Sequence, residues 1–158
     1  MSEPLTKAQK TGVAASMVAA LAAPLEGYRQ TAYQDPPGIW TVCYGSTIDV
    51  DQHKKYTLAE CKARLNADTL KAVELVERCH PGLPLNVLVA FSDASYNIGP
   101  KVACDAKKST AARMLYAGDY SGACRQLLKW DKASIMGVMV TFPGLTKRRK
   151  IESDLCLS

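Results

Sequence analysis

The chain has 158 residues, of which 47% are apolar and 22% are charged, and its net charge is +5. This length is enough for one domain with its own core, and the composition is that of an ordinary soluble globular protein. The sequence contains no internal repeat, low-complexity tract or linker, which argues against a repeat protein or a chain of several domains.

Basic residues gather in the C-terminal part of the chain. Residues 107–150 contain ten Lys or Arg and two Asp. Such a surface suits an anionic partner, whether nucleic acid, a membrane surface or an acidic polymer such as the cell wall. The alternative is a solvated helix face that keeps the protein soluble.

An uncharged, Ala-rich run extends from Thr11 to Leu25. Its layout is that of a signal peptide with a small-residue cleavage site at residues 20–22, but cleavage there would leave Glu26 on a frayed end. As a membrane span, the run is short of the roughly 20 residues required. Two interpretations remain. The run is either a helix that visits the membrane and also packs on the domain, or an ordinary amphipathic helix that ends near Pro24.

Three polar side chains stand out in the next stretch, residues 25–47. Glu26 follows the apolar run and precedes Gly27, so we expect it at a helix end with apolar neighbours that favour its protonated form. Asp35 lies in an Asp-Pro-Pro-Gly turn, where a carboxylate is solvated and charged. Thr41 begins a predicted strand. A proton-bearing acid, a charged carboxylate and a hydroxyl are the groups that an inverting glycosidase uses.

Two long helices are predicted in the middle of the chain. Thr57 and Glu60 form a capping box that begins a helix ending near Cys79. Residues 85–96 are the most apolar helix and should form the core of a larger lobe. Asn97-Ile98-Gly99 is a typical end for that helix. This signal alone predicts that Asn97 is a helix cap.

Three shorter helices are predicted in the remainder of the chain. Ser109 caps a helix to Tyr116, Ser121 begins another that runs to Trp130, and the last helix runs from Thr141 and Pro143 to Cys156.

Six cysteines are spread along the chain without a Cys-x-x-Cys pair, and the spacing of the two histidines does not suit a zinc site. An even count favours three disulfides and an oxidising compartment such as a bacterial periplasm, although six buried thiols remain the alternative. Six cysteines allow fifteen connectivities. Pairing between chain neighbours gives Cys43–Cys61, Cys79–Cys104 and Cys124–Cys156.

The motifs around these residues carry a family resemblance. Glu-x8-Asp-x5-Thr is accompanied by Glu-Gly-x-Arg, Ala-Tyr-x-Asp, Gly-x-Trp-Thr and Tyr-Gly-x-Thr, and Gly-Leu-x-x-Arg-Arg-x-x-Glu occurs near the C-terminus. This pattern resembles the phage-type lysozymes (endolysins) of glycoside hydrolase family 24, over nearly all of residues 25–157. Ser46 departs from the family, which usually has His there.

The resemblance implies a fold and a mechanism. The expected fold is α+β and mostly helical, with a small β-hairpin in the N-terminal lobe and a larger helical C-terminal lobe. The expected reaction is hydrolysis of the β-1,4 bond between N-acetylmuramic acid and N-acetylglucosamine in peptidoglycan. Glu26 would be the acid, Asp35 and Thr41 would hold the attacking water, and Asn97 and Arg148 would bind substrate.

The resemblance also implies a location. Some endolysins carry a signal-anchor-release segment, so residues 1–25 are expected to form such a helix and residues 26–158 the catalytic domain. The protein would be exported to the host periplasm, held transiently at the inner membrane through residues 11–25, and lyse the host at the end of infection. We expect a monomer that needs no cofactor or metal and binds no nucleic acid. The alternatives are a lytic transglycosylase and a non-catalytic cell-wall-binding protein.

Overall fold

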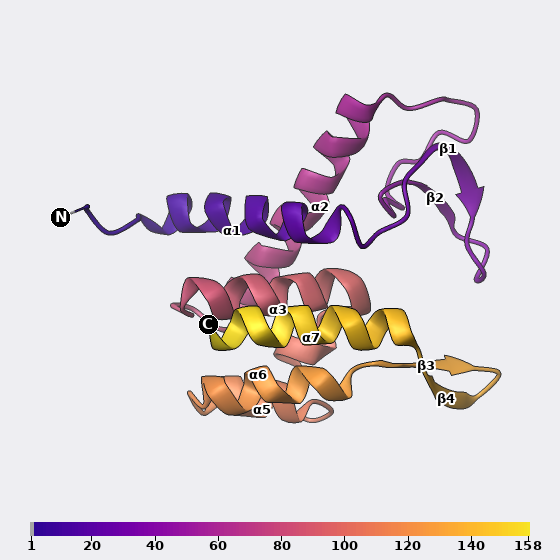
Figure 1. Ribbon diagram of the computed structural model, residues 1–158. Coiled ribbons are helices and arrows are strands. Elements are labelled where there is room, and N and C mark those ends of the chain that lie inside the picture. Colours follow the sequence, from indigo (N-terminus) through magenta and orange to yellow (C-terminus); the bar gives the residue numbers. More distant parts are fainter. Residues whose placement is uncertain (1) are drawn as a thin grey trace.

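The computed structural model describes residues 2–158, and Figure 1 shows a small lobe and a larger helical lobe joined by one long helix, α2. The elements in chain order are α1 (Lys7–Ala22), β1 (Arg29–Gln34), β2 (Trp40–Cys43), α2 (Leu58–Cys79), α3 (Leu85–Ile98), α4 (Lys101–Cys104), α5 (Thr110–Tyr116), α6 (Tyr120–Gln126), a 3-10 turn η1 (Leu127–Lys129), β3 (Lys132–Ile135), β4 (Val138–Thr141) and α7 (Pro143–Leu157). The expected α+β class is confirmed.

Helix α1 is the folded form of the Ala-rich run. Thr6 caps it, because its hydroxyl accepts a hydrogen bond from the backbone of Gln9 while the Gln9 side chain accepts from the backbone of Thr6. Its small buried residues pack against α2 and α3 and join the main core, which also contains Phe91. The Thr69 hydroxyl on α2 donates to the carbonyl of Ala15. Within residues 2–158, none of the helices is long and apolar enough to cross a membrane.

The small lobe is built on the β1–β2 hairpin and the first turns of α2. The strands are antiparallel, with Tyr33 opposite Thr41. Val42 is buried in a small cluster that includes Tyr56 and a disulfide. The predicted capping box at Thr57 and Glu60 is confirmed, and it begins α2.

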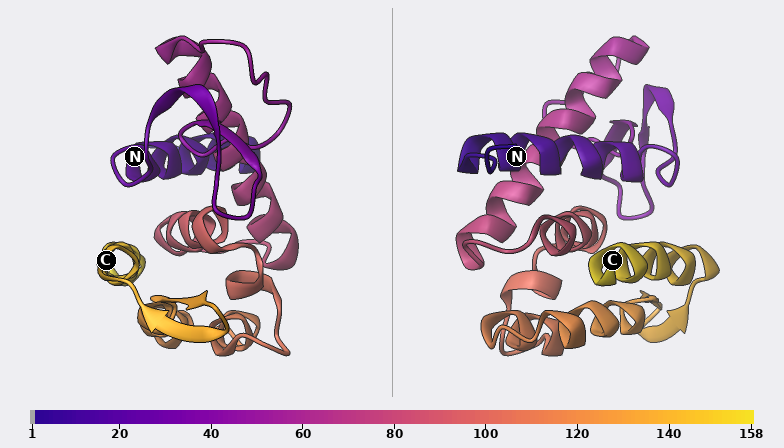
Figure 2. Two further views of the ribbon diagram at one scale, coloured as in Figure 1. Left: turned by 90° about the vertical axis from the view of Figure 1, so that its right-hand side faces the viewer. Right: turned by 60° about the vertical axis from the view of Figure 1, so that its left-hand side comes forward.

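The larger lobe is centred on α3, whose residues 87–95 are all buried. Figure 2 shows α7 lying beside α3, with α5 and α6 beneath them. The structure differs from the prediction at α6, whose cap is Asp119 rather than Ser121, because the Asp119 carboxylate accepts from the backbone N–H of Gly122. The helix expected to run to Trp130 ends at Gln126 and continues as η1.

The hairpin of β3 and β4 was not predicted. A hairpin turn with two residues at positive φ is usually Asn-Gly or Asp-Gly, but here it is Met136-Gly137, with φ values of 49° and 83°. Gly137 is typical of the second turn position, but Met136 is not typical of the first, so the sequence did not indicate a hairpin turn here. The last helix begins at Pro143, with Phe142 in the cap position.

Three disulfides link the elements, and they join the chain neighbours expected from the sequence. Cys43–Cys61 ties the β1–β2 hairpin to α2, Cys79–Cys104 ties the end of α2 to α4, and Cys124–Cys156 ties α6 to α7.

Candidate active site

Glu26 lies just beyond the end of α1, where the two lobes meet. Its backbone N–H donates to the carbonyl of Ala22 at 2.9 Å, which fixes it to the last turn of the helix. Its side chain is 21% exposed, and its Oε1 accepts a hydrogen bond from Nη1 of Arg148 at 2.6 Å. The nearest polar partner is therefore a cation, in contrast to the apolar surroundings that the sequence suggested.

Arg148 is held by a second carboxylate. Its Nε and Nη2 donate to the two oxygens of Asp93 at 3.0 and 2.9 Å, and both side chains are buried. Burial alone would lower the pKa of Arg148, but the hydrogen bonds and charge of Asp93, together with the charge of Glu26, raise it above its usual range. Arg148 therefore remains charged and its fork points one N–H group at Glu26.

A further buried pair lies behind Arg148. Nη2 of Arg149 donates to Glu152 at 2.6 Å and to Oδ1 of Asn97 at 2.8 Å. Burial and the neighbouring carboxylate of Asp93 raise the pKa of Glu152 to about 9, while the charge of Arg149 opposes the shift. Asn97 is thereby fixed by α7, and it is not the helix cap, because Gly99 holds the cap position of α3.

Asp35 and Thr41 lie on the β1–β2 hairpin and shape its turn. Oδ1 of Asp35 accepts from the backbone N–H of Ile39 at 2.8 Å, and the Thr41 hydroxyl donates to the carbonyl of Ile39 at 3.1 Å. Thr41 is buried and Asp35 is partly exposed. Both side chains are therefore fixed within the same turn of the small lobe.

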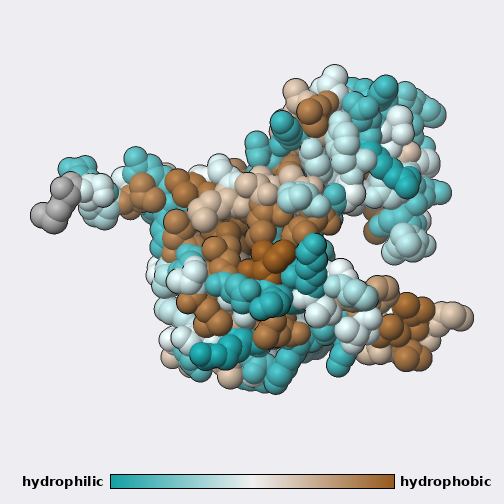
Figure 3. Space-filling view, viewed as in Figure 1, coloured by the Kyte–Doolittle hydropathy of each residue, from teal (hydrophilic) through white to brown (hydrophobic). Residues whose placement is uncertain are grey.

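A cavity of about 480 Å³ lies at the junction of the lobes, and it brings together Glu26, Asn97 and Arg148. Ala133 of β3 and Phe142 also line it, whereas Asp35 and Thr41 do not. Figure 3 shows the surface hollowed between the small lobe and the β3–β4 hairpin. A chain-like substrate lying in this hollow would contact both lobes.

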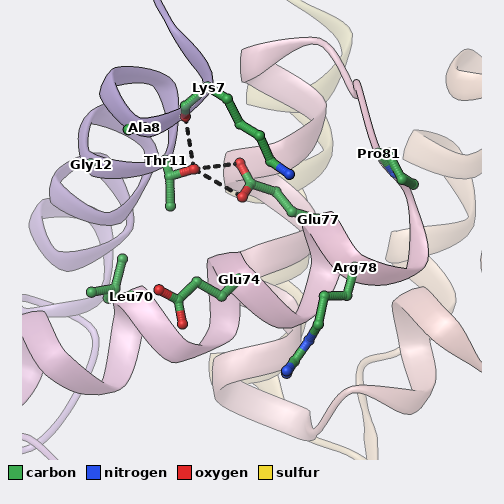
Figure 4. A pocket seen from close by; sticks show the side chains of 9 residues that line it. All are labelled: Lys7, Ala8, Thr11, Gly12, Leu70, Glu74, Glu77, Arg78 and Pro81. Carbon is green, nitrogen blue, oxygen red and sulfur yellow. Dashed lines mark hydrogen bonds between the residues drawn. The ribbon is translucent and has the colours of Figure 1, made fainter.

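A larger cavity, of about 820 Å³, lies between α1 and α2 and contains none of the predicted site residues (Figure 4). There the Thr11 hydroxyl contacts both carboxylate oxygens of Glu77 at 2.9 Å. This contact fixes the first half of α1 on α2, so the cavity is part of the helix junction.

Two site residues were not identified from the sequence. Asp93 holds Arg148, and the hydroxyl of Tyr96 donates to the carbonyl of Tyr44 beside Glu26. Burial, with the charge of Glu26, raises the pKa of Tyr96 above its usual range, so the hydroxyl keeps its proton. A carboxylate in the most apolar helix was the available signal for Asp93, because buried charges are almost always paired.

Gly45 lies beside Glu26 with a φ of 95°, a backbone conformation that favours glycine. A Cβ there would be in ordinary contact, at 3.9 Å, with both Oε2 of Glu26 and the Tyr96 hydroxyl. The next residue, Ser46, is where the family usually has His. Its hydroxyl accepts from Arg64, which also binds the carbonyls of Ile48 and Asp49. An Arg–Ser contact thus holds this loop.

Known proteins share this sequence and fold. The family model described as phage lysozyme matches residues 23–152. The SAR-endolysin of Bacteriophage PS119 is 38% identical over 135 residues, which are 84% of this chain and 77% of the relative. The SAR-endolysin of Pseudomonas phage phiKMV is 32% identical over 158 residues, 99% of this chain and 93% of the relative.

Solved structures agree. The muramidase domain of SpmX from Asticaccaulis excentricus superimposes with a TM-score of 0.79 and 26% identity, covering 99% of both chains. An endolysin from Escherichia coli O157:H7 phage FAHEc1 has a TM-score of 0.74 and 28% identity, covering 100% of this chain and 97% of its own.

The chain belongs to the phage lysozyme family. It is an endolysin and a muramidase, a glycoside hydrolase that degrades peptidoglycan.

Proposed function

We propose that the protein hydrolyses the β-1,4 bond between N-acetylmuramic acid and N-acetylglucosamine, with Glu26 as the general acid. The observation that carries this assignment is the position of Glu26, on the lining of the inter-lobe cavity and held by a buried arginine. Its partly exposed side chain takes up a proton from solvent and donates it to the oxygen of the leaving sugar.

We assign the attacking water to the β1–β2 hairpin. Asp35 stabilises the positive charge that develops on the sugar ring, and together with Thr41 it holds the water on the face opposite Glu26. Attack from that face inverts the anomeric centre. Asn97 binds substrate from the cavity lining, and Arg148, which the resemblance placed in substrate binding, acts here as a positioning residue for Glu26.

The test is Glu26→Gln, assayed by the release of reducing ends from purified sacculi. Loss of the acid should lower the rate by about 10²–10⁴-fold. Glu74→Gln is the matched control, because Glu74 is exposed on α2 and lines the other cavity. A Glu26→Gln protein with wild-type activity would exclude this mechanism.

Product analysis separates this mechanism from its rivals. Proton NMR during early turnover should show the inverted anomer, and mass spectrometry should show reducing-end sugars. A retained anomer contradicts the role given to Asp35 and Thr41, and an anhydro sugar identifies a lytic transglycosylase, which needs no attacking water. Binding to sacculi without release of any fragment identifies a non-catalytic wall-binding protein.

We further propose that residues 11–25 associate with the host inner membrane before they dock as α1. The protein then acts as a monomer in the periplasm at the end of infection, without nucleic acid as a partner. The support is the uncharged, small-residue composition of this run, which suits both a bilayer and close helix packing.

Ala20→Lys tests this association. Ala20 is exposed on α1, so the new charge leaves docking intact but disfavours the bilayer. The membrane fraction of expressing cells should lose the protein, while the purified enzyme keeps its activity. Ala8→Lys, exposed on α1 but outside the run, is the control. If Ala20→Lys leaves the membrane fraction unchanged, residues 11–25 are not the anchor.

A further inference from the structure

The β3–β4 hairpin contributes Ala133 at its base to the inter-lobe cavity, and its exposed aliphatic tip lies outside the lining of that cavity. Residues 133–146 contain no charged side chain. Met136 is 98% exposed and Val138 64% exposed. The exposed aliphatic residues of the tip are Ile135, Met136, Val138, Met139 and Val140. Figure 3 shows this hydrophobic tip projecting from the lower right of the molecule. A contiguous exposed apolar surface of this kind marks an interaction site.

The strand register gives the hairpin an apolar face. Ala133 pairs with Val140 and Ile135 pairs with Val138, so all four side chains lie on one face of the ribbon. The opposite face carries Lys132, Ser134, Met139 and Thr141. Each strand has four residues, so the hairpin extends about 13 Å. This reach exceeds the roughly 5–10 Å by which interfacial segments enter a bilayer.

Exposed cations flank the base of the hairpin along the chain. Between residues 125 and 150 the one acidic residue is Asp131, and its carboxylate accepts a hydrogen bond from Thr146. The exposed cations in the same stretch are Arg125, Lys129, Lys132, Lys147 and Lys150, of which Lys150 pairs with Asp154. The apolar tip is complementary to the acyl chains of lipids, and the positively charged residues behind it are complementary to anionic headgroups.

We propose that this hairpin docks the protein on an anionic phospholipid bilayer. The turn between Ile135 and Val138 enters the boundary between headgroups and acyl chains, and the cations at the base bind the headgroup phosphates. The strands stay at headgroup level, where water satisfies their outward backbone groups.

The chemistry of the tip favours lipid over glycan. Sugar binding uses hydrogen-bonding and aromatic side chains, and residues 135–140 supply neither. This surface is separate from residues 11–25, so a molecule whose α1 is docked on the domain still contacts the bilayer. The enzyme would then act at the membrane surface rather than throughout the compartment.

The experiment measures binding of the full chain to vesicles by co-sedimentation. The vesicles are pure phosphatidylcholine or phosphatidylcholine with about one-third phosphatidylglycerol. Met136→Asn/Val138→Asn replaces the two most exposed aliphatic residues of the tip without adding charge, and Asn tolerates the left-handed backbone at position 136. Ile48→Asn/Leu58→Asn is the matched control, because it removes two exposed aliphatic residues from the small lobe.

Wild type should bind the anionic vesicles. The affinity of the tip variant for them should be lower by about tenfold or more, because two aliphatic side chains no longer enter the acyl region. The control variant should bind like wild type, and higher salt or pure phosphatidylcholine should weaken the binding of wild type. Both variants should retain their melting temperature and their activity on sacculi.

Three results would overturn the proposal. If the tip variant binds vesicles as tightly as wild type does, another part of the protein contacts the membrane. Loss of activity on sacculi with unchanged vesicle binding makes the tip a substrate surface. A wild-type dimer in vesicle-free sedimentation that becomes a monomer in the tip variant makes it an interface between copies. None of these results depends on the mechanism at Glu26.

Discussion

Replacing Arg148 by Met removes the cation on which two carboxylates converge. Arg148 is 4% exposed, and it makes two hydrogen bonds to Asp93 and one to Glu26. Without it Asp93, which is fully buried, becomes an uncompensated charge. Breaking a buried pair in this way costs about 3–5 kcal/mol. For a chain of this size, that corresponds to a fall in melting temperature of about 6–20 °C.

A double variant isolates the cause. Arg148→Met/Asp93→Asn no longer has the uncompensated carboxylate at position 93, so thermal unfolding should show it to be more stable than Arg148→Met alone. Activity should not recover with stability, because Glu26 lacks its partner in both proteins. Arg148→Lys, which keeps the charge but loses the fork to Asp93, should retain part of the activity. The reasoning would be refuted if Arg148→Met lowered the free energy of unfolding by less than about 1 kcal/mol, or if the double variant were no more stable than Arg148→Met.

Three further predictions concern stability, each measured by denaturant or thermal unfolding. Burial and Asp93 raise the pKa of Glu152 from an ordinary 4.5 to about 9, so the native state keeps a proton that the unfolded state releases. Stability should therefore fall as pH rises from about 5 to 9, by up to about 1.4 kcal/mol per unit, and Glu152→Gln should remove this slope; an unchanged slope excludes Glu152 as its source. Cys43→Ser/Cys61→Ser opens a loop with a sequence separation of 18 residues and should lower the free energy of unfolding by about 3 kcal/mol. Dithiothreitol should destabilise wild type more than this variant. Equal destabilisation of the two proteins by dithiothreitol would contradict the prediction. Val18→Ala leaves a cavity under α1 and should cost about 2 kcal/mol, whereas Val13→Ala on the exposed side of the helix should cost far less.

Local sequence signals predicted most of the helices. The capping box at Thr57 and Glu60, the cap at Ser109 and Pro143 at the start of α7 act within a few residues, so they can be read directly from the chain. The same holds for the hairpin with Asp35 and Thr41. The β3–β4 hairpin was missed because its turn, Met136-Gly137, lacks the usual residue at the first position of positive φ.

The features of the active site also fall into those predicted from local sequence and those fixed by tertiary contacts. Glu26, Asp35 and Thr41 fall within sixteen residues, and their spacing, with the surrounding motifs and the family resemblance that these carry, predicted them to be the acting groups. The environment of Glu26 could not be foreseen, because its partner Arg148 is 122 residues away and is aimed by Asp93 on a third element. The sequence by itself therefore determined which groups are predicted to perform the chemistry. Only the tertiary structure decided which charge faces Glu26 and which aliphatic tip stays exposed, because both depend on packing between elements distant in the chain.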